Sequence, residues 1–286
     1  MPTLHVVMPV FNEGDTLREI LRRVLAAPLP SGWHSTVTMV DDGSREQAAQ
    51  VARQVAAEQS ATDRVTLVVH PANRGKGAAL MTGFDHVLAR AAPSDAVLVQ
   101  DADLEYDPAD YPALLAALHP DGRTAVFGNR WAGDVHTRST YRRVHSTANK
   151  MLTLCSNALT GLAVDDMECC YKLIPVPLLR QIRPWLSEER FGIEPQIAAA
   201  LARLNARVAQ VPVKYEPRTM AEGKKIRWKD GVRAFWVMAR ERVRRLPPPL
   251  PLSQASAPPA APAEHAARSA ASSAPGAAAA ARKASP

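Results

Sequence analysis

The chain has 286 residues and a mass of 30.9 kDa, enough for one large domain or two small ones with a sizeable core. Its net charge of +7 and pI near 9.6 indicate an anionic partner, such as nucleic acid, a membrane surface or a phosphorylated substrate. No apolar run approaches the length of about 18 residues that predicts a transmembrane helix, and the first residues lack the pattern of a signal peptide. Three cysteines without a CxxC pair argue against a disulfide framework or a cysteine zinc site, so we expect a protein of the reducing cytoplasm that is not secreted.

Short apolar runs alternate with amphipathic stretches through the first 100 residues. The expected strands are Leu4–Met8, Val37–Val40, Val65–Val69 and Ala96–Val99, and the expected helices are Asp15–Ala26, Glu46–Glu58 and Gly77–Arg90. Strands of four to six apolar residues separated by longer helices are typical of βαβ units. The sequence therefore predicts an α/β fold with a mainly parallel central sheet and helices on both faces.

Acidic side chains follow three of these strands at the point where each strand ends. They are Glu13, then Asp41 and Asp42, then Asp101, Asp103 and Glu105. Any one of them could cap a helix or form a turn, but parallel sheets bring the carboxyl ends of their strands to one edge, where ligands bind. Carboxylates gathered there repel one another unless a cation lies among them, and hard oxygen ligands favour Mg²⁺ or Mn²⁺. The Asp101-Ala102-Asp103 segment thus predicts a metal site that leaves room for substrate phosphates.

An ordered set of motifs extends this pattern over residues 3–231. The motifs are VVMPVFNE (6–13), VDDGS (40–44), NRGKGAAL (73–80), QDADLEYDP (100–108), FGNR (127–130), DMECCYK (166–172), RFGIEPQIAAALAR (190–203) and VPVKYEPRTMAEGKKIRWKDG (211–231). In this order the chain resembles family 2 glycosyltransferases, in particular the bacterial branch related to dolichol-phosphate mannosyltransferase and other polyprenyl-phosphate glycosyltransferases. The resemblance implies a GT-A fold, a Rossmann-like nucleotide-diphospho-sugar transferase, and a metal-dependent, inverting transfer from a nucleotide-sugar donor.

The resemblance also implies roles for individual residues. It places Pro9, Phe11, Glu13, Asp41 and Asp42 around the base and ribose, and Asp101, Ala102 and Asp103 near the ribose, sugar and diphosphate. Asp103, with Asp101 and Glu105, would hold Mg²⁺ or Mn²⁺; related mannosyltransferases commonly have Gln where this chain has Glu105. Arg130, Arg218, Lys224 and Lys225 match positions that contact the diphosphate or the acceptor phosphate, and arginine suits this role because its planar fork makes two parallel hydrogen bonds.

Asp166 and Glu168 decide between two kinds of acceptor. They fall where family members with hydroxyl acceptors keep a catalytic carboxylate, and an attacking hydroxyl must lose its proton to such a base. A polyprenyl phosphate is already an anionic nucleophile and needs no base. The leading hypothesis is a dolichyl- or undecaprenyl-type phosphate acceptor at the cytoplasmic membrane face. The alternative is a saccharide or other hydroxyl acceptor in cell-envelope polysaccharide synthesis, with Glu168 or Asp166 as the base.

The Gly75-Lys76-Gly77 segment matches neither GxGxxG nor a Walker loop, because Leu80 replaces the third glycine and no GK[ST] follows. It opens a helix, so it could lie near a phosphate. The simpler interpretation is a tight turn that lets the helix pack closely, and we prefer it.

The C-terminal part divides the chain into three predicted regions: a GT-A domain over 1–228, a basic amphipathic helix over 229–246, and a disordered Ala- and Pro-rich tail over 247–286. The helix places apolar residues on one stripe, namely Val232, Phe235, Trp236, Ala239, Val243 and Leu246. The stripe predicts either a helix docked on the sheet with a solvated basic face, or an interfacial helix on an anionic membrane. Residues 145–160 form a second amphipathic candidate, which resembling enzymes place over the acceptor site.

The charge distribution narrows the expected partners. Residues 218–245 hold ten Lys and Arg against three Asp and Glu, a net charge of +7, so the rest of the chain sums to zero. This pattern favours a donor diphosphate, a lipid phosphate and the inner face of the plasma membrane as peripheral contacts. A nucleic-acid-binding module would need aromatic residues interleaved with Lys and Arg, which the sequence lacks, so we expect no nucleic-acid partner.

Overall fold

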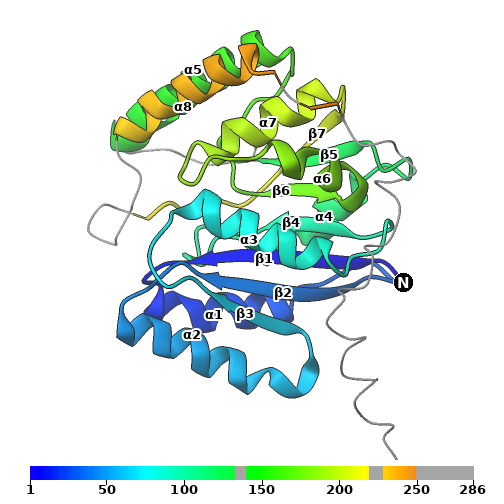
Figure 1. Ribbon diagram of the computed structural model, residues 1–286, viewed down its shortest axis with the longest axis vertical. Coiled ribbons are helices and arrows are strands. Elements are labelled where there is room, and N and C mark those ends of the chain that lie inside the picture. The colour runs from blue at the N-terminus through cyan, green and yellow to red at the C-terminus, as the bar shows by residue number, and fades with distance from the viewer. Residues whose placement is uncertain (133–139, 219–227, 246, 249–286) are drawn as a thin grey trace, which may run out of the picture.

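A seven-stranded sheet forms the centre of the protein in the computed structural model, which describes residues 1–132, 140–218, 228–245 and 247–248 (Figure 1). Across the sheet the strands are β3 (Val65–Val69), β2 (His34–Asp41), β1 (Thr3–Val10), β4 (Ala96–Val99), β6 (Lys172–Pro175), β5 (Thr124–Asn129) and β7 (Arg207–Pro212). Every neighbouring pair is parallel except the two that β6 makes with β4 and β5. The predicted α/β fold with a mainly parallel sheet is confirmed.

Helices cover both faces of this sheet (Figure 1). They are α1 (Gly14–Leu25), α2 (Glu46–Glu58), α3 (Lys76–Leu88), α4 (Tyr111–Ala116), α5 (Thr140–Thr160), α6 (Val176–Ile182), α7 (Ile193–Arg203) and α8 (Trp228–Val243). Short 3₁₀ helices cover Ser60–Thr62, Pro108–Asp110 and Arg183–Trp185. α5 and α8 lie side by side and pack against α7, at the end of the molecule far from β3 (Figure 1).

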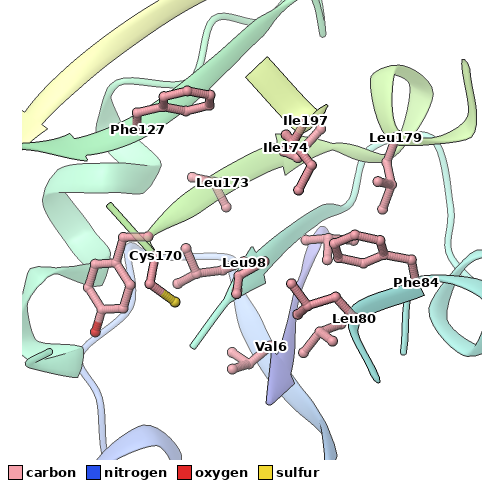
Figure 2. Packing of buried hydrophobic residues seen from close by; sticks show 14 of the residues in the cluster. Val6, Leu80, Phe84, Leu98, Phe127, Cys170, Leu173, Ile174, Leu179 and Ile197 are labelled. Atoms are coloured by element: carbon pink, nitrogen blue, oxygen red, sulfur yellow. The ribbon is translucent and has the colours of Figure 1, made fainter. Parts of the chain in front are cut away.

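The elements predicted for the first 100 residues all form; three match at both ends, and the others shift by one to three residues at an end. The core explains why their pattern is so clear. β4 is buried at every position and β1 at most of them, so these strands are nearly continuous apolar runs. Figure 2 shows Leu80 and Phe84 of α3 beside Val6 of β1 and Leu98 of β4, within one core that continues to β5, β6 and α7.

α8 packs in the orientation opposite to the docked helix considered from the sequence. Its buried side consists of Ala234, Val237, Met238 and Glu241, whereas the predicted apolar stripe is exposed from Val232 to Val243, with Trp236 53% and Val232 59% accessible. Leu246, the last residue of that stripe, lies outside the described residues. Arginines cause this orientation, because they pair with acidic side chains beneath the helix. Arg233 and Arg240 contact the buried carboxylate of Glu188 at 3.0 and 2.6 Å. The basic side of α8 therefore faces partly inward, and an apolar stripe faces outward.

Candidate active site

The carboxyl edge of the sheet collects nearly all of the residues singled out from the sequence. β1, β2, β4 and β5 end at this edge and lead into residues 11–13, 42–44, 100–105 and 130. β6 runs the other way, so the residues that precede it, 166–171, lie at the same edge. β7 is parallel to β5, and it leads along residues 213–217 to Arg218. The topology thus brings six separate segments to one place.

Arg218 joins three of the predicted carboxylates. Its guanidinium lies 3.1 and 3.2 Å from the two oxygens of Glu13, 3.1 Å from Oδ2 of Asp103 and 3.9 Å from Oε1 of Glu105. The backbone N–H of Arg218 also donates to Glu105 at 2.9 Å, and the hydroxyl of Tyr215 donates to the same carboxylate at 2.9 Å. Within the described part of the chain, the guanidinium of Arg218 therefore lies among carboxylates from the loops after β1 and β4.

Asp101 has a different cationic partner. The Lys76 ammonium lies 2.9 Å from one oxygen of Asp101 and 3.1 Å from Oε1 of Glu194 at the start of α7. Glu194 in turn contacts the fully buried ammonium of Lys172 at 2.7 Å. Negative and positive side chains thus alternate from Asp101 at the strand end to the buried Lys172. Asp101 is therefore linked through Lys76 to buried charged groups.

The surroundings of Asp103 favour a cation near its carboxylate. Burial is the main cause that raises the pKa of this carboxyl to about 7, and the neighbouring charges of Asp101 and Glu105 raise it further, while Arg218 opposes the change. Leu104, at φ 63°, turns the chain in the left-handed region between Asp103 and Glu105. A buried carboxylate beside two like charges favours any bound cation.

A divalent metal suits these donors. Among the described residues, no three His, Cys, Asp or Glu side chains form a ready-made metal cage. Mg²⁺ commonly uses only one or two carboxylates and completes its shell with substrate phosphates and water. Asp103 and Glu105 supply hard oxygens, and the guanidinium already beside them shows that a cation fits among them. The residues present therefore fit Mg²⁺ or Mn²⁺, whereas Asp101 is bound to Lys76 in this state.

The Asp42 carboxylate holds the loop of residues 73–75 by hydrogen bonds. Its two oxygens accept hydrogen bonds from the backbone N–H groups of Arg74 and Gly75 and from the Asn73 amide, at 2.7 to 3.0 Å, and they contact the His70 ring at 2.7 Å. Asp41 accepts the N–H of Ser44 at 3.0 Å and so forms the turn after β2. Both carboxylates are buried and shape the wall in which the base and ribose were predicted to bind.

Gly75 and Gly77 form the predicted tight turn at the start of α3. Gly75 has φ 108°, and a Cβ at Gly77 would lie 1.9 Å from the carbonyl oxygen of Glu188. Only glycine allows this approach of two backbones. The turn packs against residues 188–190, and it places Lys76 beside Asp101, a contact that the sequence analysis did not foresee.

Arg130 and Asp166 form a buried, bidentate pair. Nε and Nη2 of Arg130 each lie 2.7 Å from an oxygen of Asp166, and the Arg130 backbone N–H donates to the same carboxylate. The Tyr215 ring centroid lies 5.0 Å from the Arg130 guanidinium carbon. Since Asp166 fills the guanidinium fork, this pair braces the site in the described state. Asp166 is therefore poorly placed to accept a proton from a substrate.

Glu168 is the carboxylate best suited to proton transfer. Its Oε1 is buried, with no hydrogen-bond partner among the described residues. Burial is the main cause that raises the pKa of Glu168 to about 7, and the charge of Glu194 raises it further against the opposing charges of Lys172 and Arg130. A carboxyl group with this pKa can hold or release a proton near neutral pH.

Three further predicted residues, Pro9, Phe11 and Ala102, lie at the same edge of the sheet. Pro9 belongs to the end of β1, Phe11 follows that strand, and Ala102 is buried between the two aspartates. The Ala102 carbonyl accepts the Thr16 hydroxyl at 2.8 Å, which ties the loop after β4 to α1. Lys224, Lys225 and the tail from 249 onward lie outside the described residues.

Solved structures share this fold. A structure of glucosyl-3-phosphoglycerate synthase from Mycobacterium tuberculosis with Mn²⁺, UDP and phosphoglyceric acid matches with a TM-score of 0.60 and 19% identity, over 85% of this chain and 79% of that one. A second structure of that enzyme, with Mg²⁺ and UDP, matches with a TM-score of 0.58, 18% identity and the same 79% of its length, over 84% of this chain. The fold is the GT-A fold of nucleotide-sugar transferases.

The sequence profile described as Glycosyl transferase family 2 matches residues 5–182, more than half of the chain, and the chain belongs to this family. An undecaprenyl-phosphate 4-deoxy-4-formamido-L-arabinose transferase from Edwardsiella ictaluri is 30% identical over 221 residues, and one from Salmonella paratyphi A is 29% identical. Each alignment covers 77% of this chain, but this chain spans only 62% of the length of each relative.

Proposed function

We propose that the protein is a metal-dependent, inverting glycosyltransferase that moves a sugar from a nucleotide-sugar donor to a polyprenyl phosphate. The observation that carries the proposal is the group of carboxylates around a cation at the carboxyl edge of a GT-A sheet. The similarity to transferases named for undecaprenyl phosphate supports the acceptor class.

The chemistry of the described residues agrees with this reaction. A nucleoside diphosphate gains negative charge as it leaves the sugar, and a divalent metal bound by Asp103 and Glu105 would stabilise that charge. Arg218 supplies a guanidinium beside the same carboxylates, where a diphosphate would lie. Asp101, which pairs with Lys76, is suited to bind ribose or sugar hydroxyls.

The proposal is tested by the release of nucleoside diphosphate from a panel of nucleotide sugars, with undecaprenyl phosphate and Mg²⁺ or Mn²⁺ present. We expect release with at least one donor, and we expect EDTA to abolish it. Absence of release with every donor would contradict the transferase assignment.

Glu168→Gln separates the two acceptor classes. With a lipid phosphate acceptor no base is needed, so we expect the variant to keep turnover within about tenfold of the wild type, since the loss of a true general base costs about 10²–10⁴-fold. A loss of that size would instead support a hydroxyl acceptor with Glu168 as its base. The measurement is kcat with undecaprenyl phosphate and with saccharide acceptors.

The pH dependence of the free energy of unfolding tests whether Glu168→Gln removes a group that titrates in the folded protein. Its pKa is raised from 4.5 to about 7 in the folded state, so the folded protein binds this proton more tightly than the unfolded chain does. Wild-type stability should therefore fall as the pH rises through this window, by up to about 3 kcal/mol. Asp103, whose pKa is also raised to about 7, adds a loss in the same window, so Glu168→Gln should show a smaller fall in stability than the wild type. Urea denaturation of both proteins at pH 5 and pH 8 would show this difference.

We also propose that the exposed stripe of α8 contacts an anionic membrane surface at the inner face of the plasma membrane. Val232, Phe235, Trp236 and Val243 are exposed there, and α5, which packs beside α8, exposes Met151 and Leu154. The guanidiniums of Arg233 and Arg240 lie 5.4 and 4.9 Å from the Trp236 ring, so cationic and apolar groups share this surface. No helix among the described residues is long and apolar enough to cross a bilayer.

Replacing Phe235 and Trp236 by serine tests this surface. Each exposed aromatic side chain that enters the interface removes apolar area from water, so the double variant should bind vesicles of anionic lipid at least about tenfold more weakly. Cosedimentation with vesicles containing phosphatidylglycerol measures the effect. Val69→Ser is the matched control, because Val69 is 50% exposed on β3 at the other end of the sheet. Equal binding by all three proteins would rule this surface out.

A further inference from the structure

The side chain of Arg218 lies among three carboxylates of the candidate site. Its guanidinium contacts Glu13, Asp103 and Glu105, and only 18% of the side chain is exposed. The three carboxylates come from two loops, and Arg218 reaches them from the segment after β7. Arg218 therefore supplies a positive charge to this group from the described residues.

Two of these carboxylates, Asp103 and Glu105, are also the donors that suit a divalent metal. The Asp103 oxygen that accepts a hydrogen bond from Arg218 lies 3.1 Å from Nη2, so a metal bound to that oxygen would bring two cations into close contact. Like charges at this separation repel strongly in a partly buried site. The guanidinium and the metal therefore compete for the same group of oxygens.

We propose that Arg218 is an internal counter-ion of the donor site, which holds Glu13, Asp103 and Glu105 until a divalent metal displaces it. The inference rests on the proposed function, because it takes the metal and the nucleoside diphosphate as the ligands. The diphosphate offers the displaced guanidinium a new anionic partner, to which arginine can donate two parallel hydrogen bonds. Metal and diphosphate binding are then positively coupled: the metal alone binds weakly, and the two together bind well.

Arg218→Met should change the two affinities in opposite directions. Removal of the competing charge should tighten the binding of Mn²⁺ alone by about ten- to a hundredfold, the usual range of such coupling. The same change should weaken binding of a nucleoside diphosphate at saturating Mn²⁺, because the displaced guanidinium is no longer there to receive it. An arginine that only clamped the diphosphate would leave the affinity for Mn²⁺ alone unchanged. Electron paramagnetic resonance of free Mn²⁺ and calorimetry with a panel of nucleoside diphosphates measure both quantities.

Lys214→Met is the matched control, since it removes one positive charge from the same segment at a side chain that is 70% exposed and pairs with Asp107. It should change the Mn²⁺ affinity by less than about twofold. If the methionine variant does not fold, Arg218→Lys provides the test. One ammonium group cannot contact all three carboxylates, so this variant should bind Mn²⁺ alone severalfold more tightly than the wild type.

The outcomes separate this inference from the proposed function. If the wild type binds Mn²⁺ with a nucleoside diphosphate but neither variant binds Mn²⁺ alone more tightly, the counter-ion role is wrong and the proposed function stands. If the wild type binds none of the nucleoside diphosphates in the presence of Mn²⁺, both the counter-ion role and the proposed function are wrong.

Discussion

Asp103→Asn is expected to lower kcat by about a hundred- to a thousandfold, the cost of removing one electrostatic stabiliser of a developing charge. Asp103 lies among like charges, and burial and these neighbours raise its pKa to about 7 in the absence of a metal. Its carboxylate is therefore the donor with most to gain from a divalent cation. An amide keeps the shape of the side chain but contributes no charge.

The steady-state release of nucleoside diphosphate measures this effect at several Mn²⁺ concentrations. If Asp103 ligates the metal, excess Mn²⁺ should recover part of the lost rate, because the weakened site can still be filled by mass action. Asp85→Asn, at an exposed position on α3 that pairs with Arg183, should leave the rate within about twofold. An Asp103→Asn enzyme with wild-type turnover would show that the metal, if one is used, is held elsewhere.

The sequence predicted well the elements whose apolar pattern is clear, whether a short apolar run or a helical period. β4 is an uninterrupted apolar run that ends before Gln100, so the run itself marks the strand. β1 has an apolar centre, but its ends extend beyond that centre to Thr3 and Val10. β6 is harder to detect, since it has four residues and begins with the buried Lys172, whose charge interrupts the apolar pattern. Its ammonium is accommodated by Glu194, which is 22 positions further along the chain.

The acidic side chains of the candidate site were marked by the strand ends, and Arg130 and Arg218 were named from the family resemblance, but the ion-pair partners of these residues were not predicted. Strand-end carboxylates stand out because strand ends are marked by composition, whereas the partner of each carboxylate depends on tertiary structure. Lys76 was interpreted as part of a turn, although it reaches both Asp101 and Glu194. Its position between two glycines at the start of a helix was the available signal, because such a turn brings a side chain close to a strand end.

Orientation of a helix is a further property that periodicity leaves open. The predicted apolar stripe of α8 is present from Val232 to Val243, but the buried carboxylate of Glu188, in the segment before α7, pairs with Arg233 and Arg240 on another side of the helix. Ala234, Val237 and Met238 are buried on that side as well. Breaking a partly buried ion pair is costly, so these pairs and the buried apolar side chains together favour the observed orientation. The position of Glu188 in space, which periodicity does not show, therefore contributes to the choice of the covered face.

Asp166→Asn is expected to lower the free energy of unfolding by about 3–5 kcal/mol, the range for breaking a buried ion pair by removing one partner. Asp166 is fully buried and accepts two hydrogen bonds from the Arg130 side chain and one from its backbone N–H. The variant leaves the buried guanidinium without its counter-charge, and an amide nitrogen replaces one acceptor, so at least one donor loses its partner.

Urea denaturation of the two proteins gives the difference directly, provided that the m-values agree. Asp121→Asn is the matched control, because Asp121 also pairs with an arginine, Arg207, but both side chains are at least a third exposed. That change should cost no more than about 1 kcal/mol. A loss of the same small size for Asp166→Asn would mean that Arg130 finds another anion, and a nucleoside diphosphate that then bound more tightly to the variant would identify it. The expected result is the reverse: a large loss of stability, because Asp166 occupies the guanidinium fork that the sequence analysis had assigned to the diphosphate.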